Sequence, residues 1–163
     1  LDDSTKRFSE KHEFFYTIKS DLGYTFSLNK LLSISIGAGL GVLINDPNRY
    51  SFSFFLGGYR NQNINNFTTF IGYSALDVFA FSFLKTSVGM DFSLSKNHYL
   101  RLKGNIASVS DQPFDAGIWS EKRYSGYGVG YGINSFLGPI ELTSSFSPET
   151  KSPLWYFKLG WSF

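Results

Sequence analysis

A long alternation of apolar and polar residues is the feature that most constrains this chain. Over residues 14–28 the even positions are almost all aromatic or aliphatic, whereas the odd positions are mostly small, polar or charged. A period of two places successive side chains on opposite faces of a β-strand. The run exceeds the ~5–6 residues of an ordinary strand and reaches the ~9–11 that a tilted membrane strand needs.

The alternation recurs and predicts eight strands, each with one apolar face and one face of small, polar and charged residues. They cover residues 14–28, 32–44, 50–56, 84–94, 100–106, 126–133, 140–146 and 155–163. A soluble sandwich or a soluble ligand-binding barrel would also alternate, but sandwich strands are shorter and vary in length. Long apolar faces opposite polar faces favour an all-β fold, an antiparallel transmembrane β-barrel.

Composition supports this class and excludes others. The chain has 18 Phe and 10 Tyr, residues that strands favour, and no cysteine, so disulfides and thiolate metal sites are excluded. A net charge of +2 without a dense Lys/Arg run is no nucleic-acid footprint. Leu1 leads into the polar residues 2–13 rather than a signal peptide, so we expect a mature exported protein or a portion of a longer chain.

The connections predict how the strands cross the membrane. In outer-membrane barrels the periplasmic turns are short and the longer loops lie outside. Counting back from the last strand places residues 45–49, 95–97 and 134–139 in the periplasm and residues 59–81 and 111–123 outside. Residues 1–11 are then a polar periplasmic segment before a barrel of residues 12–163. The turn at residues 29–30 falls outside, where it is unusually short.

The tail of the chain resembles the C-terminal signal of bacterial outer-membrane barrels. The residues that carry the likeness are Lys158, Gly160, Trp161 and the terminal Phe163. In that class the signal is read by the barrel-assembly machinery, so the resemblance implies this machinery and outer-membrane lipid as partners. The physical basis is that an exposed strand edge with an aromatic anchor can pair with another sheet.

Further motifs resemble the surface-antigen superfamily, which includes the barrel-assembly factor. Leu137-Gly138-Pro139 is similar to its turn before the penultimate strand, and residues 55–59 (FLGGY) to a strand end. Phe70-Ile71-Gly72-Tyr73 resembles its lumen-loop motif. Residues 124–127 (YSGY), 147–149 (SPE) and 155–157 (WYF) bring the set closest to the C-terminal barrel of patatin-like phospholipases of the Bacteroidetes type, over residues 52–163.

This resemblance implies a sixteen-stranded barrel, of which the predicted strands are the C-terminal half. In such proteins a patatin lipase domain and a periplasmic docking module precede the barrel. The loop motif of the superfamily usually has an arginine before its glycine, and Ile71 stands there instead. An arginine at that position therefore cannot anchor the loop in the lumen of this protein.

No catalytic or metal site is expected in these residues. The string Gly72-Tyr73-Ser74-Ala75-Leu76 lacks the second glycine of a G-x-S-x-G elbow, so Ser74 is interpreted as a loop serine. His12 and His98 are far apart and have no clustered partner. We expect no cofactor.

Charged residues of the predicted strands share the inward face. They are Lys19, Asp21, Lys85, Asp91, Arg101, Lys103, Glu141 and Lys158. They either set the selectivity of a pore or form salt bridges with one another in a wet interior. A row of glycines at positions 126, 128, 130 and 132 either makes room for a lumen loop or lets the strand curve.

Three hypotheses follow for function. The first is the anchoring and translocation barrel of a patatin-like protein. The second is a complete eight-stranded barrel that acts as a channel, an adhesin or an accessory subunit of an outer-membrane complex, with a homodimer as another assembly. The third is a barrel lipase with its site in the strands, which no Ser/His pairing in the sequence supports.

Overall fold

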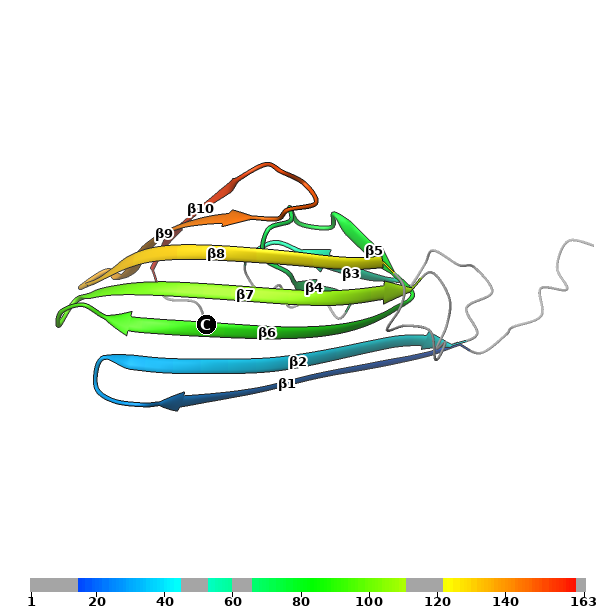
Figure 1. Ribbon diagram of the computed structural model, residues 1–163, viewed down its shortest axis with the longest axis horizontal. Coiled ribbons are helices and arrows are strands. Elements are labelled where there is room, and N and C mark those ends of the chain that lie inside the picture. The colour runs from blue at the N-terminus through cyan, green and yellow to red at the C-terminus, as the bar shows by residue number, and fades with distance from the viewer. Residues whose placement is uncertain (1–14, 45–52, 60–65, 111–121, 161–163) are drawn as a thin grey trace, which may run out of the picture.

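The main sheet is antiparallel throughout, and its strands pair in chain order, except that three short strands between β2 and β6 form a separate sheet. The computed structural model describes residues 15–44, 53–59, 66–110 and 122–160. Seven strands pair in the order β1-β2-β6-β7-β8-β9-β10 (Figure 1). They are β1 (Tyr16–Ser27), β2 (Leu32–Ile44), β6 (Ser82–Ser93), β7 (His98–Ser110), β8 (Lys122–Ser135), β9 (Gly138–Phe146) and β10 (Leu154–Leu159).

A second, small sheet lies between β2 and β6 in the chain. Its central strand β3 (Phe54–Gly57) is parallel to β4 (Phe67–Thr69) and antiparallel to β5 (Val78–Ala80). The prediction of a membrane strand over residues 50–56 is therefore wrong for the residues that are described, and residues 50–52 lie outside them. The prediction that residues 59–81 form an external loop is also wrong for the described residues 66–81, because the turn at residues 70–73 and β5 share a buried cluster with Phe83, Ala107 and Val109 of the main sheet. Residues 60–65 lie outside the described part of the chain.

The burial of β3 explains the error. Phe54 and Leu56 are fully buried, and Phe55 on the other face packs edge-on against Phe79, with ring centroids 5.7 Å apart. A strand covered on both faces satisfies an apolar pattern without meeting lipid. Its four residues are also far fewer than the 12 to 14 of β1, β2, β6, β7 and β8.

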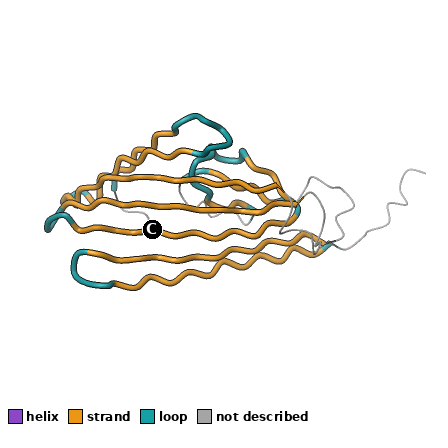
Figure 2. Tube along the Cα trace, viewed as in Figure 1, coloured by secondary structure: helices purple, strands orange, loops and turns teal. Residues whose placement is uncertain are grey.

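The tight turns all lie at one end of the main sheet (Figure 2). We call this the tight-turn end; it holds residues 28–31, 94–97 and 136–137, and the opposite end is the loop end. The turn at residues 29–30 thus lies with the other short turns, not opposite them as predicted. Because β3 is not in the main sheet, the strand count shifts by one. β1 starts at the loop end and β10 finishes at the tight-turn end, so the first and last strands do not share an end as predicted.

The predicted turn at residues 45–49 lies outside the described residues. The strand before it, β2, ends at Ile44, opposite Tyr16, at the loop end of the sheet. No helix in the described part of the chain has the length and apolar character needed to cross a membrane.

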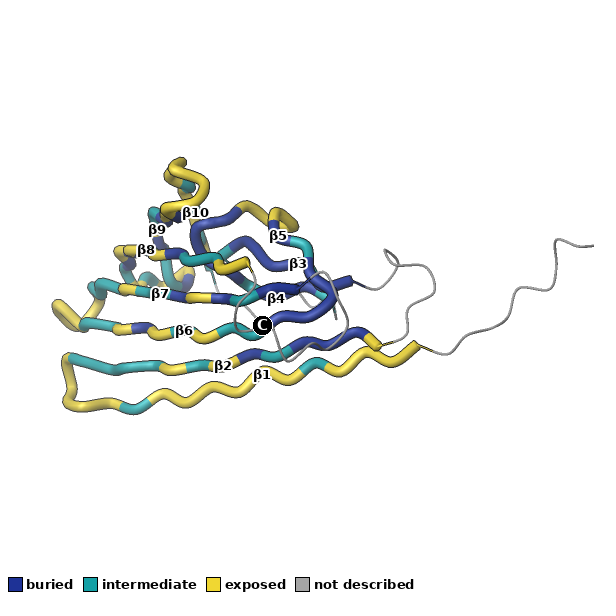
Figure 3. The backbone as a smooth tube through the Cα atoms, turned by 45° about the vertical axis from the view of Figure 1, so that its right-hand side comes forward, coloured by how far each residue is buried: buried dark blue, intermediate teal, exposed yellow. Residues whose placement is uncertain are grey.

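The buried core lies under the small sheet, near the loop end. Figure 3 shows the buried residues gathered on β3, β4, β5 and the neighbouring strand ends, whereas β1 is exposed along nearly its whole length. Phe54 meets Phe83 edge-on, with ring centroids 5.1 Å apart, and both rings are fully buried. Each such side chain contributes roughly 1.5–3 kcal/mol by burial, so this cluster fixes the small sheet on the main one.

The main sheet has two open edges among the described residues. β1 pairs only with β2, and β10 pairs only with β9. The all-β, antiparallel fold is confirmed, but no closed barrel is formed by these strands. The sheet curls, since residues from both edge strands, Asp21 and Lys158, line one cavity of about 1370 Å³.

Candidate functional site: an internal segment on the inner face

The face of the main sheet that the small sheet covers is called the inner face, and the described residues 53–59 and 66–81 are called the internal segment. On the opposite, outer face Leu22, Trp155 and Phe157 are 72%, 66% and 70% exposed. Large apolar side chains so exposed call for a nonaqueous surrounding. Four groups of contacts attach the internal segment to the inner face, and the edge strand β10 adds a fifth. Each group uses polar side chains that the sequence does not place together.

The first attachment holds the turn that resembles the lumen-loop motif. Phe70, Ile71 and Tyr73 are all buried, and Gly72 adopts a left-handed φ of 91°. A Cβ atom on Gly72 would lie 2.7 Å from the carbonyl oxygen of Phe146. Since that neighbour is backbone, it cannot rotate away, so position 72 requires glycine for space as well as for conformation.

Asn105 holds the same turn through its backbone. With the amide oriented to satisfy both atoms, Oδ1 accepts from the Ile71 N–H at 3.2 Å and Nδ2 donates to the Gly126 carbonyl at 3.0 Å. Asn105 is 5% exposed. Because Asn105 binds the backbone of residue 71, this hydrogen bond does not need a polar side chain at that position, where the protein has isoleucine.

The glycine row of β8 serves two purposes. A Cβ atom on Gly126 would collide with the Ile71 carbonyl oxygen, and one on Gly128 would lie 3.1 Å from Ile71 Cγ2. Positions 130 and 132 instead make room for side chains of the sheet itself, Thr143 and the Tyr99 ring. Half of the row therefore accommodates the internal segment, and the other half accommodates the second attachment.

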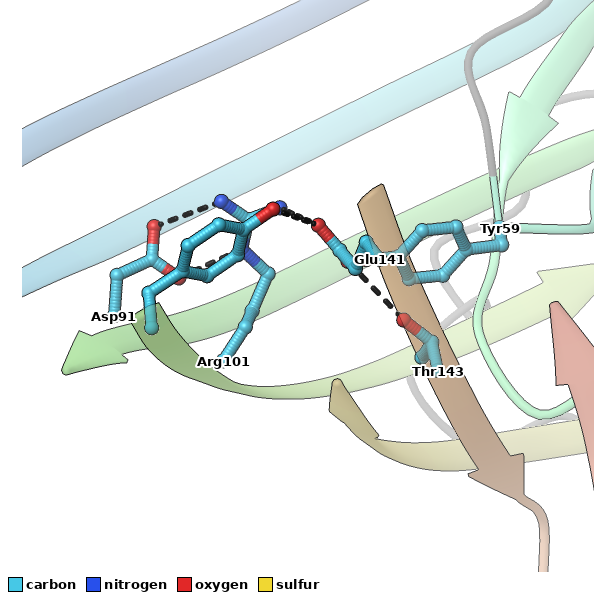
Figure 4. A network of polar contacts seen from close by, with 6 residues as sticks. Tyr59, Asp91, Arg101, Glu141 and Thr143 are labelled. Carbon is cyan, nitrogen blue, oxygen red and sulfur yellow. Dashed lines mark hydrogen bonds and ion pairs between the residues drawn. The ribbon is translucent and has the colours of Figure 1, made fainter. Parts of the chain in front are cut away.

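The second attachment is a network centred on Glu141, whose side chain is 1% exposed (Figure 4). Tyr59, from the internal segment, donates its hydroxyl to Glu141 Oε1, and Thr143 donates to the same oxygen at 3.1 Å. Tyr99 and Arg101 Nη1 each donate to Oε2 at 2.9 Å. Burial and the nearby Glu141 carboxylate raise the pKa of Tyr59, which stays a donor at neutral pH.

Arg101 extends this network across the sheet. Its Nε donates to Asp91 Oδ1 at 2.7 Å while Nη1 holds Glu141, so one guanidinium joins β6, β7 and β9. A planar guanidinium suits such a double carboxylate contact. Lys103 stands over the Tyr59 ring, with Nζ 4.7 Å from its centroid.

The third attachment caps the open edge of β4. Lys19 Nζ donates to the Phe67 carbonyl at 2.8 Å, and Lys85 Nζ to the Thr69 carbonyl at 3.2 Å. Residues two apart on a strand point their carbonyls the same way, so the two lysines satisfy consecutive edge groups. Asp21 lies between them, 3.6 Å from Lys19 and 4.0 Å from Lys85.

The fourth attachment is at the loop end. Tyr73 donates to Glu149 Oε2 at 3.0 Å, and Ser147 donates to the same oxygen, with its Oγ 2.8 Å from the Tyr73 hydroxyl oxygen. Glu149 Oε1 accepts from the N–H of Ser125 at 3.0 Å and from its hydroxyl at 3.1 Å. Burial raises the pKa of Tyr73 to about 12. Burial alone would raise the pKa of Glu149, but the hydrogen bonds from Ser147, the Glu149 backbone, Tyr73 and Ser125 lower it.

The edge strand β10 also reaches the internal segment. Tyr156 stacks on Tyr59, with ring centroids 5.4 Å apart, and donates to the Tyr73 carbonyl at 3.1 Å. Tyr99, Asn105 and Tyr156 were not foreseen as site residues. The available signal was that each is a larger polar residue on a face otherwise built of glycine, serine and charge.

The structure brings six of the eight predicted inward charges into contact. Lys19, Asp21 and Lys85 form one group, and Asp91, Arg101 and Glu141 another. Lys103 and Lys158 form no ion pair within the described residues. Selectivity for ions stays a prediction. Of the predicted assembly signal, Lys158 is on the inner side of β10, Gly160 has a φ of 90°, and Trp161 and Phe163 lie outside the described residues.

Ser74 lies in an exposed turn, where its N–H donates to Asp77 Oδ2 at 2.7 Å. In the described part of the chain, no group of three or more His, Asp and Glu residues is placed to hold a metal ion.

An antiparallel sheet with an apolar outer face, and with a folded segment on its inner face, is typical of membrane proteins that cross the bilayer with strands. The OMP85 superfamily model matches residues 3–163, and the chain therefore belongs to the OMP85 superfamily. This membership confirms the superfamily expected from the motifs and places the protein in the bacterial outer membrane. No curated protein and no solved structure matches the chain.

Proposed function

We propose that these strands are the C-terminal half of a sixteen-stranded outer-membrane barrel that anchors a patatin-like protein. The observation that carries the proposal is the direction of the two edge strands. β1 and β10 both run from the loop end to the tight-turn end, because the seven strands between and including them alternate in direction. Both edges are open among the described residues.

The direction of the edges limits what can close the sheet. Single-chain bacterial barrels are antiparallel with an even strand number. Pairing β1 directly with β10 would be parallel, so an odd number of further strands is required. Nine further strands would make sixteen. A second copy in the same orientation would again place β1 beside β10, which argues against closure as a homodimer.

The exposure of β1 supports the same proposal. Ten of its twelve residues are exposed, including positions on both faces. A strand with one neighbour and two uncovered faces is not stable alone, since its unpaired N–H and C=O groups would lie in lipid. Additional strands would satisfy those groups, and the barrel-assembly machinery is the partner we expect to seat them.

The inner face carries no arrangement suited to catalysis among its described residues. Its buried carboxylate, Glu141, is occupied by Arg101 and three hydroxyl groups, and Ser147 is fully buried and bonded to Glu149. We therefore assign anchoring to this part and hydrolysis to a domain outside these residues.

The complete native polypeptide tests the proposal. It should contain a G-x-S-x-G elbow, hydrolyse a fluorogenic lipid ester in the outer-membrane fraction, and lose that activity when the elbow serine is changed to alanine. The serine variant should remain in the membrane as a folded barrel. A complete polypeptide without such a domain, or a hydrolase that stays in the membrane after removal of residues 12–163, would contradict it.

A further inference from the structure

The tight turns carry large apolar side chains where turn chemistry favours small and polar ones. Phe136 is 94% exposed, and the others are Leu28, Leu31, Leu94 and Leu137, at 59%, 62%, 59% and 61%. We call these five residues the turn rim. Each of the three turns contributes at least one of them, so the feature belongs to the whole end of the sheet.

The turn rim continues the apolar outer face. Leu28 follows Tyr24 and Phe26 on the outer side of β1, and Leu94 follows Met90 and Phe92 on the outer side of β6. The apolar surface of the sheet thus extends around its end rather than stopping at the last paired residue. A surface continuous with lipid-facing strands is most simply covered by the same lipid.

The charge of the turns fits the same occupant. Lys30 and Lys96 lie in the first and second turns and are exposed, and residues 28–31, 94–97 and 134–138 contain no Asp or Glu. Lysines beside apolar residues at a membrane surface extend their ammonium groups to the phosphates. The combination of leucine, phenylalanine and lysine is typical of a headgroup boundary.

Several backbone N–H groups of the turns form hydrogen bonds within the protein, as a region poor in water requires. Asn29 Oδ1 accepts from the N–H groups of Leu31 and Leu32, both at 2.8 Å. Ser135 Oγ accepts from the Leu137 N–H at 3.2 Å, and the Asn134 N–H donates to Asn97 at 2.7 Å. Backbone groups that face lipid must be paired internally, and the N–H groups of Leu31, Asn134 and Leu137 are paired with a side chain or with the neighbouring turn.

We infer that the turn rim inserts into the phospholipid headgroup boundary, with Lys30 and Lys96 on anionic headgroups, and so sets how deeply the barrel sits. The inference uses the outer-membrane location and is independent of the patatin assignment. It predicts a membrane contact for residues that the strand pattern alone would place in water.

The 163 residues contain no cysteine, so a single label reports on one position once any cysteine elsewhere in the complete protein has been replaced by serine. Single variants Leu94→Cys and Phe136→Cys of the complete protein are labelled with an environment-sensitive fluorophore and folded into phosphatidylethanolamine/phosphatidylglycerol vesicles. Quenching is compared for lipids with a nitroxide near the headgroup or deep in the acyl chain. Val129→Cys, at the middle of the outer face of β8, is the lipid control, and Ala75→Cys, in the internal segment, is the water control.

The inference predicts that the shallow nitroxide quenches labels at positions 94 and 136 about twofold more than the deep one, because an interfacial group lies near the headgroup boundary. The order should reverse at position 129, and position 75 should respond only to an aqueous quencher. Labels at 94 and 136 that respond to the aqueous quencher, or to neither, would mean water or a protein covers the turns and would overturn the inference. Failure at position 129 as well would contradict the membrane sheet itself.

The lysines are tested separately. Phosphatidylglycerol should accelerate insertion of the native protein, and the double variant Lys30→Gln/Lys96→Gln should lose that acceleration while reaching the same folded yield. An acceleration equal to that of the native protein would overturn the role of the lysines.

Discussion

Glu141 shows how much of the internal segment depends on single side chains. Its carboxylate is 1% exposed and takes hydrogen bonds from Tyr59, Tyr99, Thr143 and Arg101. Alternation in the sequence can assign inward positions to charges of one strand, but it cannot pair Glu141 with Tyr59. That contact spans 82 positions and exists only because the chain folds back onto the sheet.

Replacing Glu141 with glutamine should lower the free energy of unfolding, since Arg101 then lies beside a neutral group. Breaking a buried pair costs about 3–5 kcal/mol, and we expect the lower end because Arg101 keeps Asp91. Urea unfolding in detergent measures it. Asp21→Asn is the matched control: its side chain is 50% exposed and its lysines are 3.6 and 4.0 Å away, so a loss under about 1 kcal/mol is expected. Equal losses in both variants would contradict the central place of Glu141.

Tyr73 and Glu149 give the attachment at the loop end a pH dependence on both sides of neutrality. The pKa of Glu149 is lower in the folded protein, so its contribution is present above the unfolded value of 4.5 and is lost as pH falls through the folded pKa. The pKa of Tyr73 is raised from 10.0 to about 12, so its contribution is present below pH 10 and is lost as pH rises toward 12.

The melting temperature measured against pH should therefore fall on both flanks. Glu149→Gln should flatten mainly the acid flank and Tyr73→Phe mainly the alkaline flank, and each variant should weaken the other flank because Glu149 raises the pKa of Tyr73 and Tyr73 lowers that of Glu149. An acid flank unchanged in Glu149→Gln would show that other groups govern the attachment.

At the scale of elements, the alternation correctly predicts β1, β2, β6, β7, β8, β9 and β10 as strands, with ends that differ by several residues. The alternation fails to place β3 correctly, because it shows that a strand has two different faces but not whether lipid, water or protein covers each face. β3 is apolar on both faces, with Phe54 on one and Phe55 on the other, and both faces are covered within the protein. Once β3 is removed from the count, the short turn at residues 29–30 joins the other tight turns and needs no special account.

The β8 strand is shaped by its partner on the inner face. Gly126→Ala should destabilise the protein by about 1–3 kcal/mol, because the new methyl group meets the Ile71 carbonyl, which is backbone and cannot move aside cheaply. Gly104→Ala on β7 is the control, since its Cβ atom would have no neighbour nearer than 3.7 Å. Chemical denaturation compares the two, and an equal cost would contradict a tight fit between β8 and the internal segment.

At the scale of the whole molecule, the described residues form a curled main sheet with two open edges, and the internal segment is bound to its inner face. The class of fold could be predicted from the sequence because lipid on one side imposes a regular pattern on every strand. Whether the sheet closes into a barrel could not be predicted. Pairing between the edge strands depends on the direction in which they run and on the number of strands, and the alternation within one strand gives neither. The odd number of strands in the main sheet shows that its two edge strands run in the same direction. This number is known only once β3 has been assigned to the small sheet.

The distance between the two edges tests the central claim most directly. Spin labels on Leu22→Cys in β1 and Phe157→Cys in β10, both on the outer face, can be measured by electron–electron resonance in the complete protein in membranes. Our account predicts a separation of many strand spacings, because further strands lie between the edges. A separation close to one spacing of ~4.8 Å plus the labels would mean that β1 pairs with β10 and would contradict it.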